Sequence, residues 1–153
     1  MNSIKINYFT RSDAEFQIAA DIRTAVFTRE QGADELGEFD CYDETALFAL
    51  LYIDSKPAGT ARIAKVEKGY KIGRIAILKE YRGLGLGAVI VNAVTERAFN
   101  LGADTVYVDA QNYAVPFYEK LGFRLCGEQL IDRGLPHMPM KIEKGEFYGK
   151  EEK

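Results

Sequence analysis

Three glycines on alternate positions form the stretch of this sequence with the clearest chemical meaning. Gly83, Gly85 and Gly87 lie in YRGLGLGAVIV, residues 81–91, between an apolar run and an apolar pattern with helical spacing. A helix that begins there directs several backbone N–H groups, with the positive end of its dipole, at one point in space. Glycine lets a bulky anion approach the main chain because no Cβ intervenes. The segment therefore predicts an anion site, and a diphosphate is the natural ligand because it satisfies more donors than one phosphate.

Two nucleotide-binding motifs and a structural role compete for these glycines. Gly83, Gly85 and Ala88 satisfy the G-x-G-x-x-[GA] fingerprint of dinucleotide-binding folds. That fold also needs an acidic residue ending the next strand, but Asp104 precedes its strand and Asp109 comes late. A P-loop fails because no Gly-Lys-Ser/Thr follows. Glycines can also serve only to let a helix pack closely on a strand. Three glycines on alternate positions, preceded by an arginine, favour the anion site instead.

Few other residues suggest acid–base or nucleophilic chemistry. His137, the only histidine, could relay a proton near neutral pH, or it could be a hydrogen-bonded structural residue. An acidic cluster near the end of the first predicted helix would attract an amine cation, or it could be a solvated loop. Its members are Glu30, Glu35, Glu38, Asp40, Asp43 and Glu44. Cys41 and Cys126 lack metal-ligand spacing and a neighbouring histidine, so we expect reduced structural thiols, no metal site and no covalent catalysis.

The hydrophobic pattern predicts the elements that position these groups. Residues 3–9 alternate as a half-buried strand, and Ser12 with Glu15 has the spacing of a capping box, so a helix should run from Ser12 to Gly32. Residues 32–44 read as an acidic loop. Further strands are predicted at 45–53, 58–66, 70–78, 104–110, 123–131 and 137–143, with helices at about 85–101 and 114–122.

Composition places the chain among ordinary globular domains. Of its 153 residues, 47% are hydrophobic and 28% charged, and no apolar stretch approaches the roughly 20 residues of a membrane span. We expect one domain over residues 1–145 with a polar tail over 146–153. The first residues lack the pattern of a signal peptide, which predicts a cytoplasmic location. A net charge of -3 provides no basic footprint, so neither nucleic acid nor membrane is an expected partner.

Two motifs in this sequence resemble those of the GNAT superfamily of acyl-CoA-dependent N-acetyltransferases. Arg82, Gly85 and Gly87 match its motif A, [RQ]-x-x-G-x-[GA]. AVPFYEKLGF, residues 114–123, resembles its motif B, A-x-x-[FL]-Y-x-x-x-G-F, with Tyr118 at the position of the aromatic hydroxyl. The motifs occur in the family's order and at its usual separation. VFTREQ, residues 26–31, and GLPHMPM, residues 134–140, look like a little-characterised branch of small stand-alone members.

The resemblance implies an α/β (α+β) fold and a cofactor. The GNAT fold has a mixed, mostly antiparallel sheet of about six to seven strands with about four helices on both faces. Its middle is splayed, here between residues 72–78 and 104–110. The implied cofactor is acetyl-CoA, whose pantetheine arm would pair with the strand edge like an added strand. Its diphosphate would lie on the backbone of the glycine segment.

Individual residues take their expected roles from the same resemblance. The cofactor-binding residues would be Arg82, Gly83, Leu84, Gly85, Leu86, Gly87 and Ala88 for the diphosphate and Ile75, Ala76 and Ile77 for the pantetheine. Many relatives carry a cofactor-contacting asparagine seven residues before the tyrosine; that position is Gln111 here, and Asn112 is one residue late. Tyr118 would protonate the departing sulfur.

The implied activity is direct transfer of an acetyl group to an amine of a small molecule or peptide. Glu30, Glu38, Asp40 and His137 are the candidate residues of the acceptor site. Dimers are common among family members, which leaves a homodimer open. The alternative of a different class is a non-catalytic acyl-CoA-binding sensor or interaction module that keeps the cofactor slot without acceptor chemistry.

Overall fold

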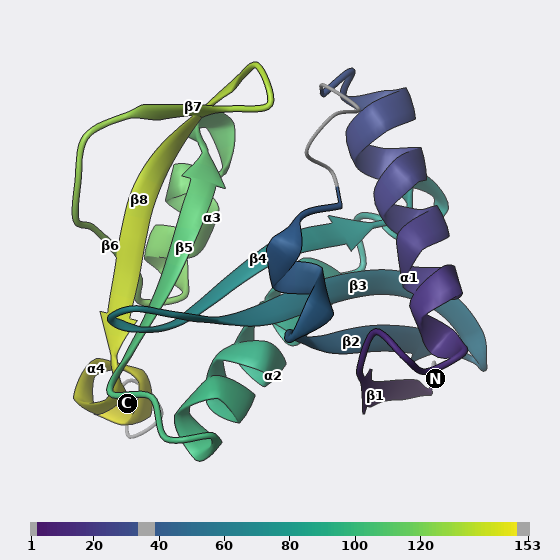
Figure 1. The fold of residues 1–153 in the computed structure, drawn as a ribbon, viewed down its shortest axis with the longest axis horizontal. Coiled ribbons are helices and arrows are strands. Elements are labelled where there is room, and N and C mark those ends of the chain that lie inside the picture. The colour runs from purple at the N-terminus through teal and green to yellow at the C-terminus, as the bar shows by residue number, and fades with distance from the viewer. Residues whose placement is uncertain (1–2, 34–38, 150–153) are drawn as a thin grey trace.

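A mixed sheet of eight strands forms the centre of the computed structural model, which describes residues 3–33 and 39–149 (Figure 1). The strands follow the order β1-β2-β3-β4-β5-β8-β6, and β7 pairs with β8. They are β1 (Ile4–Phe9), β2 (Leu47–Ile53), β3 (Lys56–Val66), β4 (Gly69–Ile77), β5 (Thr105–Gln111), β6 (Arg124–Leu125), β7 (Leu130–Asp132) and β8 (Leu135–Glu143). Among these pairings only β4 with β5 is parallel. The expected mixed, mostly antiparallel sheet is confirmed.

Helices cover both faces of this sheet. They are α1 (Glu15–Arg23), α2 (Leu86–Asn100), α3 (Val115–Lys120) and α4 (Lys144–Gly149), and α1 continues as the π-helix Thr24–Glu30. Short 3₁₀ turns occur at Cys41–Glu44, Lys79–Tyr81 and Asn112–Ala114. The helix α1 packs on one face, called the α1 face, and α2, α3 and α4 pack on the other, called the α2 face. Within the described residues, no helix is long and apolar enough to cross a bilayer.

The two faces have separate hydrophobic cores because the strands bury side chains on both sides. In β2, Phe48 and Leu50 join the core beneath α1, whereas Ala49 and Leu51 join the core beneath α2. All four are at most 1% exposed. This alternation explains why the sequence of β2 is a continuous apolar run, since a strand covered on both faces has no polar side.

The sheet opens between β4 and β5. Their parallel pairing extends only from Tyr70 opposite Val106 to Ile72 opposite Val108, although β4 continues to Ile77 and β5 to Gln111. Figure 1 shows the two strands diverging beyond that point. A bulge in β4 contributes to the divergence, because two β4 residues oppose one β3 residue there. The expected splay in the middle of the sheet is therefore present.

Three local expectations were wrong. Ser12 and Glu15 do not form a capping box; α1 begins at Glu15, and the Glu15 Oε2 atom instead accepts hydrogen bonds from Asn7 at 3.4 Å and Tyr52 at 3.1 Å. The strand predicted at 123–131 divides into β6 and β7. Residues 146–149, predicted to lie in a polar tail, belong to α4, where Phe147 is 2% exposed against Phe99.

Candidate functional site

The glycine segment forms an exposed backbone turn at the start of α2. Gly83 and Gly85 have φ values of +83° and +76°, which residues with a side chain rarely adopt. A Cβ atom added at either position would meet no protein atom within 4 Å, so the space beside this backbone is open. The first turn of α2 carries no acidic side chain, and the positive end of its dipole has no counter-charge from the helix itself. Such a terminus is suited to hold an anion.

This turn borders a cavity of about 770 Å³ at the open edge of β4. The predicted cofactor residues that line it are Ile75, Ala76, Ile77, Arg82, Gly83, Gly85, Leu86, Gly87, Ala88 and Gln111. Leu84 is not among them; it is 54% exposed at the surface. The Asn112 Nδ2 atom donates to Gln129 Oε1 at 2.8 Å, and Asn112 lines neither described cavity. Of the two residues that could replace the family's asparagine, Gln111 lies in the site.

Arg82 closes the outer end of the cavity. Its Nε and Nη2 atoms donate to the Ile77 carbonyl oxygen at 3.0 and 2.8 Å, which fixes the turn against the end of β4. The same guanidinium pairs with Glu30, and this hydrogen bond holds the pKa of the Glu30 carboxyl below its ordinary value. Glu30 therefore lies beside the glycine segment and lines the first cavity rather than the second.

The backbone of β4 presents alternate residues to the open slot. The Leu78 amide donates to the Ala58 carbonyl at 2.8 Å, and Ala76 lies opposite Thr60 of β3 in the same register. Because hydrogen-bonding residues alternate along an antiparallel strand, the polar backbone atoms of Ala76 face β3 and those of Ile77 face the slot. Arg82 reaches the Ile77 carbonyl from that side. Ala76 is thus turned away from the edge where the sequence placed it.

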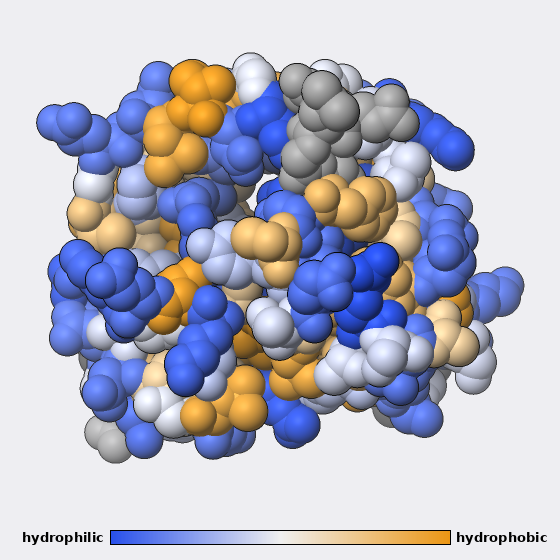
Figure 2. All heavy atoms as spheres, viewed as in Figure 1, coloured by the Kyte–Doolittle hydropathy of each residue, from blue (hydrophilic) through white to orange (hydrophobic). Residues whose placement is uncertain are grey.

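A second cavity, of about 550 Å³, continues from the first across a shared wall. Both cavities are lined by Gln31, Ile75, Gln111, Tyr113 and Leu135. Gln111 Nε2 donates to Gln31 Oε1 at 2.8 Å, joining the end of the π-helix to the end of β5 above the slot. Figure 2 shows hydrophilic side chains around a hollow in this part of the surface. The two cavities therefore adjoin, with the glycine segment at the first and several charged side chains at the other, which is called the second cavity below.

Tyr118 enters the second cavity from the α2 face. It lies on α3 and is 7% exposed, with its ring edge-on to Phe117 and Phe123. Pro116 in the first turn and Gly122 after the last turn limit this helix to six residues. Burial raises the pKa of the Tyr118 hydroxyl above its ordinary value, so this group keeps its proton at neutral and mildly alkaline pH.

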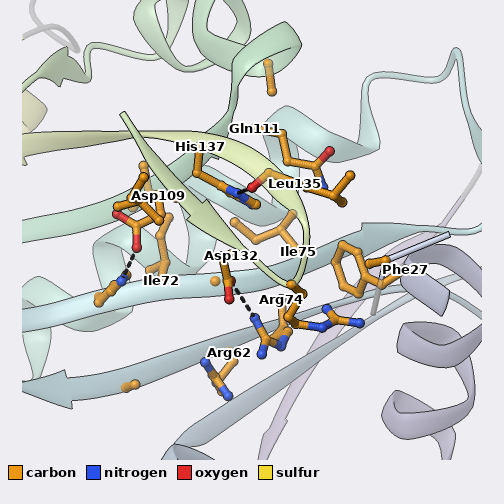
Figure 3. Close-up of a pocket in the computed structure, with 18 of the residues that line it drawn as sticks. Phe27, Arg62, Ile72, Arg74, Ile75, Asp109, Gln111, Asp132, Leu135 and His137 are labelled. Carbon is orange, nitrogen blue, oxygen red and sulfur yellow. Dashed lines mark hydrogen bonds and ion pairs between the residues drawn. The ribbon is translucent and has the colours of Figure 1, made fainter. Parts of the chain in front are cut away.

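His137 enters the same cavity from β8, beside Gln111 and Leu135 (Figure 3). Its Nδ1 atom lies 2.8 Å from the carbonyl oxygen of Leu135. Asp40 also lines the cavity and is bound to two arginines, with Arg62 at 2.7 Å and Arg74 at 3.3 Å. Glu38, the remaining candidate acceptor residue, lies outside the described residues.

A buried charge network supports this side of the cavity. Asp43, only 2% exposed, accepts hydrogen bonds from Arg23 at 2.9 Å and from Arg62 at 3.1 Å. Burial alone would raise the pKa of the Asp43 carboxyl, but the two guanidinium groups outweigh it and the pKa is lowered. The network fixes Arg62, and through it Asp40, at the cavity wall.

Several residues of the second cavity escaped the sequence analysis. Arg74 stands in the β4 bulge with a φ of +47°, and its Nη1 atom lies 3.9 Å from Asp132 of β7. Asp109 pairs with Lys71 where β4 and β5 part. Arginines within the apolar runs of β3 and β4 were the available signal, since a charged residue inside a buried strand needs a partner.

Comparison with known proteins gives a consistent family assignment. The model of the acetyltransferase (GNAT) domain matches residues 13–144. A provisionally named acetyltransferase of Bacillus subtilis strain 168 is 40% identical over 132 residues, which cover 84% of this chain and 90% of that protein. An acyl-CoA N-acyltransferase structure from Pseudomonas aeruginosa aligns with a TM-score of 0.81 at 25% identity, over 91% of this chain and 99% of that one. A GNAT acetyltransferase structure from Elizabethkingia anophelis with acetyl-CoA bound shares the fold, with a TM-score of 0.72 at 18% identity over 92% and 97% of the chains.

Proposed function

The chain belongs to the GNAT acetyltransferase family, and we propose that it transfers an acetyl group from acetyl-CoA directly to the amine of a small molecule or peptide. The observation that carries this proposal is the turn at Gly83 and Gly85. Its left-handed backbone leads into the N-terminus of α2, and both Cβ positions face open space beside a cavity of about 770 Å³. Side chains at these positions would occupy the volume that a diphosphate needs.

The rest of coenzyme A finds a matching surface along β4. The slot beyond Ile72 leaves a strand edge without a neighbouring strand, and an extended amide-containing arm can add to such an edge. Ile77 turns its backbone toward this edge, so pairing there involves Ile77 rather than Ala76. The arm would run from the glycine turn toward Gln111, at the wall between the two cavities.

The proposed reaction forms one bond and breaks one. The amine nitrogen attacks the thioester carbonyl, the C–N bond forms, the C–S bond breaks, and the sulfur leaves with the electron pair. Tyr118 supplies the proton that converts this thiolate into a thiol. Its raised pKa suits the role because the same apolar surroundings also raise the pKa of a sulfur held beside it. Direct transfer needs no covalent intermediate, and neither Cys41 nor Cys126 lines the described cavities.

The second cavity supports an amine acceptor of modest size. Its volume of about 550 Å³ lies within the range of small-molecule sites. Asp40, Asp109 and Asp132 give its wall carboxylate oxygens that can accept hydrogen bonds from an acceptor; Asp40 pairs with Arg62 and Arg74, Asp132 lies beside Arg74, and Asp109 pairs with Lys71. All of these groups come from one chain.

A thiol-release assay tests the transfer. Purified protein is given acetyl-CoA and a panel of amines, polyamines, amino acids and peptides with free N-termini, and free coenzyme A thiol is measured. Release that depends on one class of amine, with the N-acetylated product seen by mass spectrometry, supports the proposal. Binding of acetyl-CoA without release across the panel would instead favour the acyl-CoA sensor.

Tyr118→Phe tests the assigned proton donor. Only a hydroxyl is lost, so kcat is expected to fall on the order of 10²-fold while the Kd for acetyl-CoA stays within twofold. The matched control is Tyr52→Phe, which removes a hydroxyl that bonds Glu15 outside both cavities. A Tyr118→Phe protein with wild-type turnover would remove this residue from the reaction.

A further inference from the structure

The hydrogen bond to Leu135 determines the proton distribution on His137. A carbonyl oxygen can only accept a hydrogen bond, so the Nδ1 atom, 2.8 Å away, must be the donor. In the neutral ring the single N–H is then on Nδ1, and Nε2 carries a free lone pair. The ring therefore presents a proton acceptor on its far side, and His137 lines the second cavity.

The sheet register places His137 next to the wall that both cavities share. His137 of β8 lies directly opposite Gln111 of β5, and residues opposite one another in adjacent strands share a face. Gln111 is the β5 residue that bonds Gln31 and closes the slot. Figure 3 shows His137, Gln111 and Leu135 together along one side of the cavity. His137 thus stands where the proposed thioester would meet the acceptor.

His137 and Tyr118 reach the second cavity from opposite faces of the sheet. Leu135, two residues before His137 on β8, packs against the core of the α1 face, and strand alternation puts His137 on that same face. Tyr118 belongs to the core of the α2 face. The splay between β4 and β5 lets both side chains border one space.

We propose that His137 is the general base of the acyl transfer, with Nε2 accepting the proton that the attacking nitrogen must lose. The assignment rests on the proposed function. Nitrogen attack on the carbonyl forms the C–N bond, the N–H electron pair stays on nitrogen as the proton passes to Nε2, and Tyr118 protonates the sulfur as the C–S bond breaks. One proton is taken and one is given, so the enzyme returns to its starting state once solvent exchanges a proton between the two groups.

The other charged groups at this cavity are less suited to the role. They are Asp40, Arg62, Lys71, Arg74, Asp109, Asp132 and Arg133. Each carboxylate is held by a cation: Asp40 by Arg62 and Arg74, Asp109 by Lys71, and Asp132 by Arg74. A carboxylate oxygen that already contacts a cation is less available to accept a proton from the attacking nitrogen. The cations themselves are donors, which leaves the His137 ring as the basic group.

The test compares His137→Asn with the wild type in two reactions. Asparagine can keep the hydrogen bond to Leu135, since its amide nitrogen takes about the place of Nδ1, while the base is lost. The first reaction uses the amine that the wild type acetylates fastest in the panel. The second is hydrolysis of acetyl-CoA by water with enzyme in excess. No acceptor amine is present to change its own protonation state, so the fall in rate at acidic pH, the acid limb of the pH–rate profile, reports the catalytic base.

His137→Asn is expected to lower thiol release in both reactions on the order of 10²–10⁴-fold, to leave the Kd for acetyl-CoA within twofold, and to flatten the acid limb of hydrolysis. Added imidazole should restore part of the rate in His137→Ala. Asp109→Asn and Asp132→Asn should keep the acid limb, because their carboxylates are not the base. Wild-type turnover in His137→Asn, or loss of the limb in Asp109→Asn instead, would overturn the assignment while leaving the acetyl transfer intact. No thiol release from the wild type in either reaction would overturn both proposals.

Discussion

Replacing Gly85 by alanine should weaken coenzyme A binding more than it weakens the fold. Gly85 has a φ of +76° at the start of α2, and a Cβ there would meet no protein atom within 4 Å. The fold loses about 1–2 kcal/mol because alanine is strained in a left-handed conformation. Coenzyme A binding should lose more free energy than folding does, because the added methyl group occupies the space through which the diphosphate approaches the backbone.

The affinity loss follows from the hydrogen bonds at risk. A hydrogen bond to a charged group contributes about 1.5–3 kcal/mol, and 1.4 kcal/mol corresponds to a tenfold change in Kd. Losing one such bond therefore raises the Kd for coenzyme A by about 10–150-fold. Isothermal titration calorimetry with coenzyme A gives the Kd, and thermal unfolding without ligand gives the change in stability, a few degrees in Tm for a chain of this size.

A glycine beyond the other end of α2 provides the matched control. Gly102 follows the other end of α2 with a φ of +110° and equally open surroundings, so Gly102→Ala should cost stability without changing the Kd. If Gly85→Ala and Gly102→Ala bind coenzyme A equally well, the turn does not hold the diphosphate and the reasoning is refuted.

Two further predictions concern stability. Because the folded-state pKa of Asp43 is lowered from 3.8, its contribution is present above that pH and is lost as pH falls through the folded value. Asp43→Asn should cost about 3–5 kcal/mol at pH 7, because it removes a buried carboxylate that accepts hydrogen bonds from both Arg23 and Arg62. Denaturation at pH 7 and pH 3 should show this difference shrinking with acid; a constant difference would contradict the prediction. Phe147→Ala should lower the free energy of unfolding by about 3–5 kcal/mol, because Phe147 is 2% exposed and packs against Phe99. A change of under 1 kcal/mol in urea unfolding would show that α4 does not stabilise the fold.

The glycine segment and the tyrosine were within reach of sequence analysis because their signals are local. Gly83, Gly85 and the helix that follows lie within a few residues, and their geometry depends on backbone conformation rather than on distant contacts. Tyr118 was identified because the residues around it, 114–123, resemble a short family motif. Its burial, which alters its acidity, depends on Phe123 and the α2 face and became visible only in the structure.

The rest of the site depends on contacts between residues far apart in the chain. Gln31 meets Gln111 only because the end of α1 becomes a π-helix and β5 leaves its neighbour, and neither event has a local sequence pattern. The bulge that holds Arg74 in β4 reads as an ordinary strand position. Glu30 and Asp40 are close in the sequence, but in the fold Glu30 pairs with Arg82 and Asp40 pairs with Arg62.

The prediction of a polar tail over residues 146–153 was also wrong for residues 146–149. Residues 146–149 contain two aromatics among polar residues, which resembles a solvated tail when no partner is known. Phe147 packs on Phe99 at the end of α2, and a contact of that kind depends on where β8 delivers the chain. Tertiary packing, rather than local propensity, makes this segment a helix.

The central claim is that the backbone amides at the start of α2 hold the diphosphate of coenzyme A, and a crystal structure of the protein with coenzyme A tests it most directly. The account predicts diphosphate oxygens 2.7–3.2 Å from backbone nitrogen atoms within residues 83–88, with the thiol end at the wall beside Gln111. A diphosphate bound elsewhere, with these amides hydrogen-bonded to protein atoms instead, would contradict it.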